Sequence, residues 1–417
     1  MSTTVLLLQL ITILVTARAC GWLLRYLGQP SVVGEMAAGL LLGPMVAGAL
    51  WPEPHAQLFS KASLAGLASL STLGLVFFMF LIGLELRAQH GMKAQLKAAG
   101  YVGVISTAVP MVLGLAIAPV LHPALAPKGV AFWPFALFVS VALSITAFPV
   151  MARILKDRGM SRTAFGQLSL SAAALVDVFA WVLLALVVAL AGAGEGYAGL
   201  LRTTLGTAAL CVFVFLLLKP GYAWLLRKYA PNGEASATVL ATLILGLLVC
   251  AMLTEWLRLH AVFGAFLFGA CLPRDDRLLH SMAERLEPLS IVVLMPLFFA
   301  LAGLGTTAGA FSGAGLGAMA LILGVAVFGK IAGGAVGARI AGYGWRDSMA
   351  TGSLMNARGL MELIVMKVGR DAGLIGSELF TMLLIMALVT TAMTGPLISF
   401  CAGRAAVARD EDKHVAV

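Results

Sequence analysis

The sequence predicts an all-α, polytopic membrane protein of about thirteen transmembrane helices. Composition is the first reason: of 417 residues, 61% are hydrophobic and only 11% are charged, whereas about a quarter of the residues in a soluble protein are charged. Patterning is the second reason. Apolar runs of about 20 residues, long enough to cross roughly 30 Å of hydrocarbon, recur along the chain. These runs are continuous rather than alternating, so we expect helices and not the strands of a barrel.

Thirteen apolar segments are candidate spans, of which the ninth and tenth are short or broken. They are Thr4–Tyr26, Pro30–Leu50, Leu64–Leu86, Ala98–Leu121, Val130–Leu155, Thr163–Ala191, Gly199–Leu226, Ser236–Trp256, His260–Leu272, Leu289–Leu304, Leu316–Ala341, Ser348–Val368 and Leu379–Phe400. No soluble domain fits between them. We therefore expect one transmembrane domain over residues 1–403 and a short, disordered cytoplasmic tail over residues 404–417.

The net charge of +9 reflects topology rather than nucleic-acid binding, because Lys and Arg gather in short clusters between spans. The loops after odd-numbered spans and the tail, counted with Arg25 and Arg339 at adjoining span ends, hold 17 Lys and Arg residues. The loops after even-numbered spans, counted with Arg202 and Lys367 at adjoining span ends, hold 6. The positive-inside rule places the richer set in the cytoplasm. The sequence thus predicts a multi-pass protein of a bacterial inner (plasma) membrane, with its N-terminus outside and its C-terminus in the cytoplasm.

Two spans look like interrupted helices. The fifth contains "SITAFPVMAR", in which Pro149 follows two hydroxyl residues, and the twelfth contains "SLMNARGLMELIV", with several polar residues at membrane depth. They lie seven spans apart, as six helices, a linker helix and six more helices would place them. Because an odd offset inverts the second copy, this spacing predicts an inverted repeat. Broken helices at corresponding positions of two repeats point to the binding site of a secondary transporter.

Asp177 lies near the middle of the sixth span and is the leading candidate for an ion or proton site. An ionised carboxylate near the bilayer centre costs between about 3 and well over 10 kcal/mol, so its presence there requires a reason. A carboxylate is a hard oxygen ligand for which protons and alkali cations compete. The alternative is a structural acid that is paired with a neighbour or permanently protonated.

Polar residues of the interrupted spans and of the eleventh span are further candidates for the site. Carbonyls freed by Pro149, together with the hydroxyls of Ser144 and Thr146, are candidate ligands for a dehydrated cation. Lys330, near the middle of the eleventh span, is the expected charge partner of Asp177, and its alternative role is to cap the carbonyls of a broken helix. In the twelfth span, Arg358 and Glu362 are four residues apart and predict a mainly structural ion pair, and Asn356 belongs to the same interrupted segment.

The combination of motifs resembles the monovalent cation:proton antiporter-2 family, the Kef-type and cation/H⁺ exchanger group with a sodium/hydrogen exchanger-like transmembrane domain. The motifs are "GQPSVVGEMAAGLLLGP", "LGLVFFMFLIGLELR", "SITAFPVMARIL", "SAAALVDVFAWVLLAL", "HAVFGAFLFGACLP", "PLFFALAGL", "GK" with its small-residue tail, and "MNARGLMELIV". The resemblance implies thirteen helices with inverted repeats, two interrupted helices that cross, a dimerisation domain, a moving core domain and a homodimer. It matches Asp177 to the family's essential aspartate and Lys330 to its core lysine.

One position departs from the family pattern. Val176 stands where the family commonly has Asp, Asn or Gln, so a polar neighbour of Asp177 is missing. With one titrating carboxylate, and with Lys330 remaining protonated, one cation replaces one proton and the cycle is electroneutral. If Lys330 releases a proton when the cation binds, two protons move per cation. The departure also leaves the choice of ion open.

The leading functional hypothesis is a secondary antiporter that exchanges K⁺ or Na⁺ for H⁺ by alternating access, with cation and proton competing for Asp177. The alternatives are a channel-like or uniport cation pathway and a non-transporting sensor on the same scaffold. We expect no enzymatic activity, cofactor or resident metal, because no metal cluster, nucleophile–base pair or phosphate loop is evident. The partners we expect are the cation, H⁺, the lipid bilayer and a second copy of the chain, with no nucleic acid.

Overall fold

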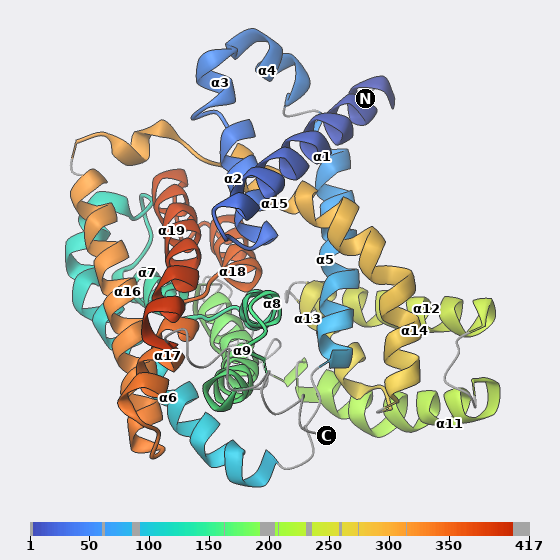
Figure 1. The fold of residues 1–417 in the computed structure, drawn as a ribbon. Coiled ribbons are helices and arrows are strands. Elements are labelled where there is room, and N and C mark those ends of the chain that lie inside the picture. The colour runs from blue at the N-terminus through green and yellow to red at the C-terminus, as the bar shows by residue number, and fades with distance from the viewer. Residues whose placement is uncertain are drawn as a thin grey trace. The chain divides into compact units, whose positions relative to one another are not determined.

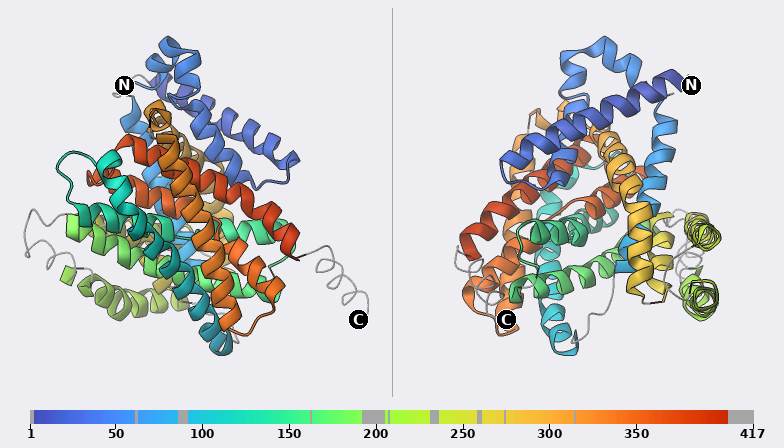
Figure 2. Two further views of the ribbon diagram at one scale, coloured as in Figure 1. Left: turned by 90° about the vertical axis from the view of Figure 1, so that its left-hand side faces the viewer. Right: turned by 45° about the vertical axis from the view of Figure 1, so that its right-hand side comes forward.

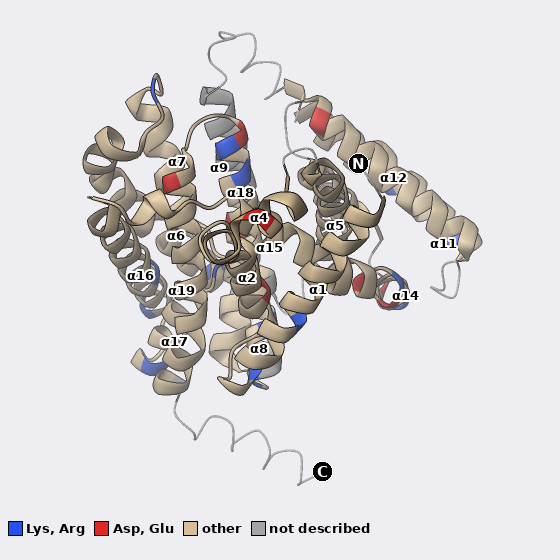
Figure 3. Ribbon diagram, turned by 90° about the horizontal axis from the view of Figure 1, so that it is seen from above, with Lys and Arg blue, Asp and Glu red and all other residues tan. Residues whose placement is uncertain are grey.

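The computed structural model describes residues 3–60, 63–85, 92–161, 163–191, 205–206, 208–230, 236–257, 261–273, 275–313 and 315–402. Throughout these residues the regular structure is helical (Figure 1). Nine helices within them are long and apolar enough to cross a membrane. Lys, Arg, Asp and Glu are sparse along the ribbon, and the long helices are mostly uncharged (Figure 3). The prediction of an all-α membrane protein is therefore confirmed, whereas the count of thirteen crossings stays a prediction.

The nine helices do not include the two interrupted spans. The fifth predicted span consists of α7 (Phe132–Ser144) and α8 (Phe148–Asp157), and the twelfth consists of α17 (Trp345–Met355) and α18 (Leu360–Asp371). The ninth span is the short α13 (Ala261–Cys271), and the sixth is α9 (Ala164–Ala191). The tail over residues 404–417 lies outside the described residues.

The chain divides into two compact units, each made of three segments, and the first boundary between them falls within α1 (Thr3–Tyr26). The first unit comprises Met1–Thr16, Val46–Gln89 and Gly192–Gly303. Its other elements are α3 (Ala47–Leu50), α4 (Pro52–Leu58), α5 (Leu64–Glu85), η2 (Val214–Leu218), α11 (Lys219–Tyr229), α12 (Ala237–Trp256), α13, α14 (Asp276–Glu287), η3 (Pro288–Leu294) and α15 (Met295–Leu304).

Close packing of α5 on α13 forms the centre of the first unit. A Cβ at Gly83 would lie 2.3 Å from the carbonyl oxygen of Phe266, and one at Gly269 would lie 2.3 Å from that of Phe80. Beside this crossing the rings of Phe80 and Phe268 stack with centroids 5.9 Å apart. Glycines at such crossings let helix backbones approach where no hydrophobic effect drives them together in lipid.

The second unit comprises Ala17–Met45, His90–Ala191 and Leu304–Val417. Its elements are α2 (Ser31–Leu42), α6 (Met92–Leu125), α7, α8, α9, the short 3₁₀ helix η4 (Ala308–Phe311), α16 (Gly315–Ile340), α17, α18 and α19 (Ser377–Ala402). Both interrupted spans and Asp177, Lys330 and Arg358 belong to this unit. In it α16 lies alongside α6 (Figure 2).

The glycine-rich face of α16 fixes the depth and direction of Lys330. Gly329, Gly333 and Gly337 recur every four residues and so share one face of the helix. A Cβ at any of them would lie within 3.0 Å of an α6 atom. Gly334 faces α17 instead, and a Cβ at Gly334 would lie 2.8 Å from the Cα of Gly352. Because α16 is held on two sides, the Lys330 side chain is fully buried inside the second unit.

Candidate ion-exchange site

The break between α7 and α8 covers residues 145–147. Ile145 follows the last helical residue with φ −75° and ψ 143°, which is extended backbone. Pro149 occupies the first turn of α8, where its missing N–H leaves no intrahelical bond unmade. The interruption predicted from Pro149 and its polar neighbours is therefore present, and the proline begins the second half-helix.

The break between α17 and α18 covers residues 356–359. Asn356 caps the end of α17, and its Nδ2 donates to the carbonyl oxygen of Thr390 on α19 at 3.2 Å. The backbone N–H of Arg358 donates to Oγ1 of Thr391 at 2.9 Å, and this hydroxyl in turn donates to the Arg358 carbonyl at 2.7 Å. The irregular backbone thus finds its hydrogen bonds in α19, as backbone at membrane depth requires.

The two breaks contact each other directly. The backbone N–H of Ala147 donates to the carbonyl of Ala357 at 3.0 Å. The hydroxyl of Thr146 donates to the carbonyl of Met355 at 3.1 Å. A Cβ at Gly359 would lie only 2.6 Å from Cγ2 of Val150, so glycine is needed for this approach. Direct bonds between the breaks hold the four half-helices as one cluster.

Arg358 neutralises the carbonyl end of α7. Its Nη1 donates to the Ala142 carbonyl at 3.1 Å and its Nη2 to the Leu143 carbonyl at 2.7 Å. Nη1 also forms an ion pair with Oε1 of Glu362 at 3.0 Å, and both side chains are fully buried. The predicted pair between Arg358 and Glu362 is therefore present. It also places a cation at the negative end of α7 and an acid in the first turn of α18, where helix dipoles favour them.

Lys330 contacts the α7–α8 break. Its ammonium donates to Oγ1 of Thr146 at 2.7 Å and also to the carbonyl oxygen of Ser144. No ion pair joins Lys330 to Asp177 among the described residues, although the two charges are close enough to interact electrostatically. The direct pair expected from the sequence is therefore not seen. Lys330 instead has the alternative role considered from the sequence, in which it caps the carbonyls of a broken helix. The ammonium is attracted there because the last carbonyls of α7 lack helical partners.

Asp177 faces the start of α8. The carboxyl group interacts with the backbone N–H of Phe148, the first residue of that half-helix. The side chain is only 3% exposed. Its Oδ1 is buried and has no hydrogen-bond partner among the described residues. A carboxylate at the N-terminal end of a helix is favourably placed, and the unpaired oxygen is available to a proton or a cation.

The candidate ligands behave differently. Thr146 Oγ1 lies at the centre of the cluster, between Lys330 and the α17 carbonyl that it bonds. The Ser144 hydroxyl instead donates to the Val141 carbonyl of its own helix at 2.8 Å. It is the Ser144 backbone oxygen that faces the lysine. Both residues are buried, and their role as cation ligands stays a prediction.

Val176 is buried in an apolar cluster that also includes Ala147 and Ala357 of the two breaks. It is 1% exposed, and the same cluster includes Val102. A Cβ at Gly103 of α6 would lie 3.5 Å from its Cγ2. Successive residues on a helix differ by about 100° in direction, so the valine fills the contact with α6.

Sequence reasoning did not single out the two α19 threonines, Thr390 and Thr391. Both are fully buried, and their oxygens satisfy the break between α17 and α18. The available signal was the "TT" pair at positions 390–391 inside an apolar span. Hydroxyls are common inside membrane helices because they bond their own carbonyls, so the pair alone does not predict this contact.

Two interrupted helices that contact each other at their breaks, beside a buried acid and a buried base, define a secondary transporter. The chain belongs to the sodium/hydrogen exchanger family, whose transmembrane model matches residues 11–402. It is therefore a multi-pass integral membrane protein. Within the described residues, no group of three or more His, Cys, Asp or Glu side chains is arranged to hold a metal ion.

The chain is similar along most of its length to two curated antiporters and to one solved antiporter structure. The chain is 39% identical to the Na⁺/H⁺ antiporter NhaS4 of Synechocystis sp., covering 95% of this chain and 98% of the relative. It is 33% identical to the K⁺/H⁺ antiporter 1 of Saccharomyces cerevisiae, covering 88% of this chain but only 43% of that protein. The structure of the sodium proton antiporter MjNhaP1 from Methanocaldococcus jannaschii matches with a TM-score of 0.67 at 14% identity, over 97% of this chain and all of that one. This last match confirms the fold.

Proposed function

We propose that this protein exchanges a monovalent cation, K⁺ or Na⁺, for H⁺ across the membrane by alternating access. The observation that carries the proposal is the Asp177 carboxyl group, buried in the second unit with one oxygen unpaired beside a broken helix. Membership of the exchanger family and the names of the relatives support the same reaction. Cation and proton compete because either can neutralise the carboxylate, and a low-dielectric site disfavours leaving it charged.

The Lys330 side chain is the second group that changes its contacts during the proposed cycle. Its ammonium uses two oxygens of the α7–α8 break, the Ser144 carbonyl and Thr146 Oγ1. A dehydrated cation bound to Asp177 needs further oxygen ligands, and these are the oxygens within reach of the break. We therefore propose that the cation displaces Lys330 from Thr146 and the Ser144 carbonyl. The contacts of the ammonium favour this route over rupture of a direct pair with Asp177.

The role proposed for the ion pair between Arg358 and Glu362 is structural. The guanidinium bonds two carbonyls of α7 from a position on the opposite break, and Glu362 balances its charge. The pair thereby holds the two breaks together, and Asn356 does the same between the break and α19. None of these three side chains needs to bind the transported ion.

Assembly and orientation complete the proposal. We propose a homodimer in the bacterial inner membrane, with the clusters of Lys and Arg on the cytoplasmic side, the N-terminus outside and the C-terminus inside. The second unit, which holds the ion site, is the proposed moving core. The charge bias of the loops supports the orientation, and the location of Asp177 and both interrupted spans in the second unit supports its role as the moving core.

A proteoliposome assay tests the proposed exchange. Purified protein is reconstituted with a pH-sensitive dye inside, and NaCl, KCl, LiCl or choline chloride is added outside. We expect proton movement with Na⁺ or K⁺ and none with choline. Asp177→Asn should insert and fold but show no cation-coupled flux, and Asp371→Asn, which changes an exposed acid, serves as the matched control.

The same assay separates the alternatives. A channel-like or uniport pathway would carry the cation as a current that follows the membrane potential, without an opposite proton flux. A sensor would carry neither ion. Coupled exchange at near wild-type rate in Asp177→Asn would remove Asp177 from the site and contradict the proposal.

A further inference from the structure

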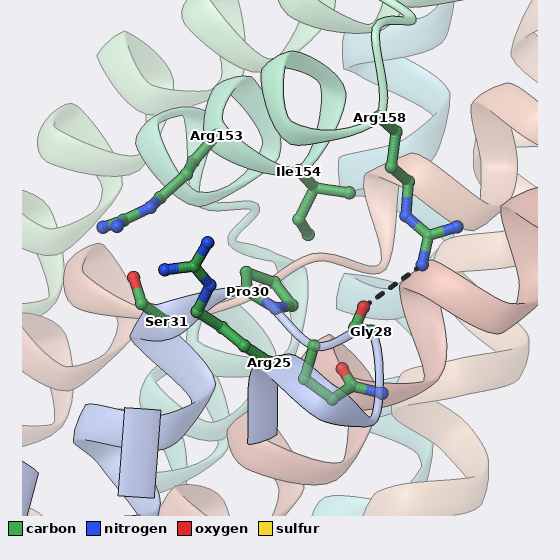
Figure 4. Close-up of a pocket in the computed structure, with 8 residues that line it drawn as sticks. Arg25, Gly28, Pro30, Ser31, Arg153, Ile154 and Arg158 are labelled. Carbon is green, nitrogen blue, oxygen red and sulfur yellow. Dashed lines mark hydrogen bonds between the residues drawn. The ribbon is translucent and has the colours of Figure 1, made fainter. Parts of the chain in front are cut away.

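A cavity of about 520 Å³ in the second unit is lined by three arginines among other residues, and neither Asp177 nor Lys330 is part of its lining. Its walls come from the end of α1, the start of α2 and the α8 region, three elements that the chain brings together around the α1–α2 connection (Figure 4). The lining residues are Arg25, Gly28, Gln29, Pro30, Ser31, Arg153, Ile154 and Arg158. We call this the arginine cavity.

Three guanidinium groups give the arginine cavity its charge. Figure 4 shows Arg25 and Arg153 on one side, near Ser31, and Arg158 on the other. Arg158 is already engaged, since it donates to the Gly28 carbonyl and to the Ser399 hydroxyl of α19. Among the described residues, no hydrogen bond or ion pair is recorded for the guanidinium of Arg25 or of Arg153. The donors of both guanidinium groups are thus available to a ligand, although Arg153 also interacts electrostatically with Glu35.

The first turn of α2 adds polar groups that also favour an anion. Its N-cap is Pro30, which provides no side-chain cap for the first turn. The Ser31 hydroxyl oxygen is buried and has no partner among the described residues. The N-terminal end of a helix carries a partial positive charge and unused N–H donors, both of which favour an anion. These donors lie on the same wall as Arg25 and Arg153.

The nearby acid does not cancel this charge. Glu35, one turn further along α2, interacts electrostatically with Arg153 and with Arg18. It is not among the lining residues, and no ion pair between it and a cavity arginine is recorded in the described part of the chain. Three cations against one acid leave a net positive cavity. A net positive cavity favours an anionic ligand.

We propose that the arginine cavity binds an anionic phosphate group, and that the bound phosphate ties α8 to the α1–α2 connection. Planar guanidinium forks match phosphate oxygens in pairs. The phosphate comes from the headgroup of an anionic lipid or from a soluble phosphate. Because α8 begins at Phe148, which faces Asp177, a ligand that fixes the other end of this half-helix acts on the element that the ion site uses. The ligand is therefore a candidate regulator of exchange.

Binding can be measured without any transport assay, so its failure is distinct from a failure of the proposed exchange. Full-length protein is placed in nanodiscs of phosphatidylcholine, and its melting temperature is followed as sodium phosphate is titrated against sodium chloride of equal Na⁺ concentration, with choline chloride added to equalise the ionic strength. A second series replaces part of the phosphatidylcholine with phosphatidylglycerol. Stabilisation by phosphate in the first series identifies a soluble ligand, and stabilisation by phosphatidylglycerol alone identifies a lipid headgroup.

Variants locate the effect in the cavity. Arg25→Gln and Arg153→Gln, singly and together, should weaken the apparent affinity by about tenfold or more, because each removes a charge-assisted pair of bonds. Arg227→Gln, which changes an exposed arginine of the first unit, is the matched control and should bind as the wild type does. If a variant does not fold, the comparison of phosphate with chloride on the wild-type protein still tests whether phosphate binds. Equal effects of phosphate and chloride with no effect of phosphatidylglycerol, or unchanged binding in the double variant, would overturn the proposal.

Discussion

Replacing Arg358 should destabilise the protein more than replacing its partner Glu362. The guanidinium of Arg358 makes three polar contacts, two with α7 carbonyls at 3.1 and 2.7 Å and one with Glu362 at 3.0 Å. Glu362 makes only the last of these, and its Oε2 has no partner among the described residues. Arg358→Met therefore strands two carbonyls and a buried carboxylate, whereas Glu362→Gln leaves the bonds between Arg358 and α7 intact.

The magnitudes follow from this asymmetry. Breaking a buried pair by removing one partner costs about 3–5 kcal/mol when the other charge is stranded, which is the case for Arg358→Met. Glu362→Gln keeps an acceptor oxygen for Arg358, so we expect about 1–3 kcal/mol. The double variant should cost less than the sum of the two single variants by about 1–3 kcal/mol, because the stranded carboxylate is gone.

Equilibrium unfolding in mixed micelles, with helicity followed as the SDS fraction rises, measures these differences. Lys367→Gln is the matched control, since Lys367 forms an exposed i,i+4 pair with Asp371 on the same helix. Such a pair contributes at most about 1 kcal/mol. A Glu362→Gln variant as unstable as Arg358→Met, or strictly additive effects in the double variant, would refute the proposed bridging role of the guanidinium.

Three more predictions concern the same unit. Lys330→Gln should lower the melting temperature and weaken the stabilisation produced by the transported cation; melting curves unchanged with and without the cation would limit the lysine to a cap. Gly333→Ala should destabilise α16 by about 1–3 kcal/mol through overpacking against α6, whereas Gly324→Ala on the same helix, with nothing within 4 Å of its Cβ, should be neutral or stabilising in the same unfolding assay. With Val176 in the apolar core and Asp177 as the carboxylate that exchanges cation for proton, exchange should be electroneutral, and proteoliposomes clamped at zero and at a negative potential should transport equally; a strong response to the clamp would identify the lysine as a second proton carrier.

Hydrophobic patterning and two local signals were enough to predict the helical fold and its interruptions. Pro149, which follows two hydroxyl residues, indicated the first break, although prolines also lie inside the continuous helices α6 and α19. The segment "NARG" places polar and charged residues at membrane depth, where a lipid-facing helix does not tolerate them. The pair of Arg358 with Glu362 was equally accessible, because a spacing of four residues fixes neighbours on one helix face. Each of these inferences depends on residues close together in the sequence.

Contacts between residues far apart in the sequence could not be predicted from local patterns. Reasoning from charge alone pairs Lys330 with Asp177, whereas in the structure the ammonium bonds the Ser144 carbonyl and Thr146 at the end of α7. The support that Thr391 gives to the α17–α18 break depends in the same way on how α19 packs. The arginine cavity combines residues more than 100 positions apart, among them Arg25 and Arg153. No local pattern relates such residues, since only the fold decides which of them meet.

The mutual exclusion of cation and proton at Asp177 is the central claim, and proton release on cation binding tests it most directly. Calorimetric titration of the detergent-solubilised protein with NaCl or KCl, in buffers of different ionisation enthalpy, counts the protons released per cation bound. We predict that the wild type approaches one proton per cation as the pH is lowered and that Asp177→Asn releases none. Proton release in Asp177→Asn equal to that of the wild type would contradict the account, because the exchanged proton would then reside on another group.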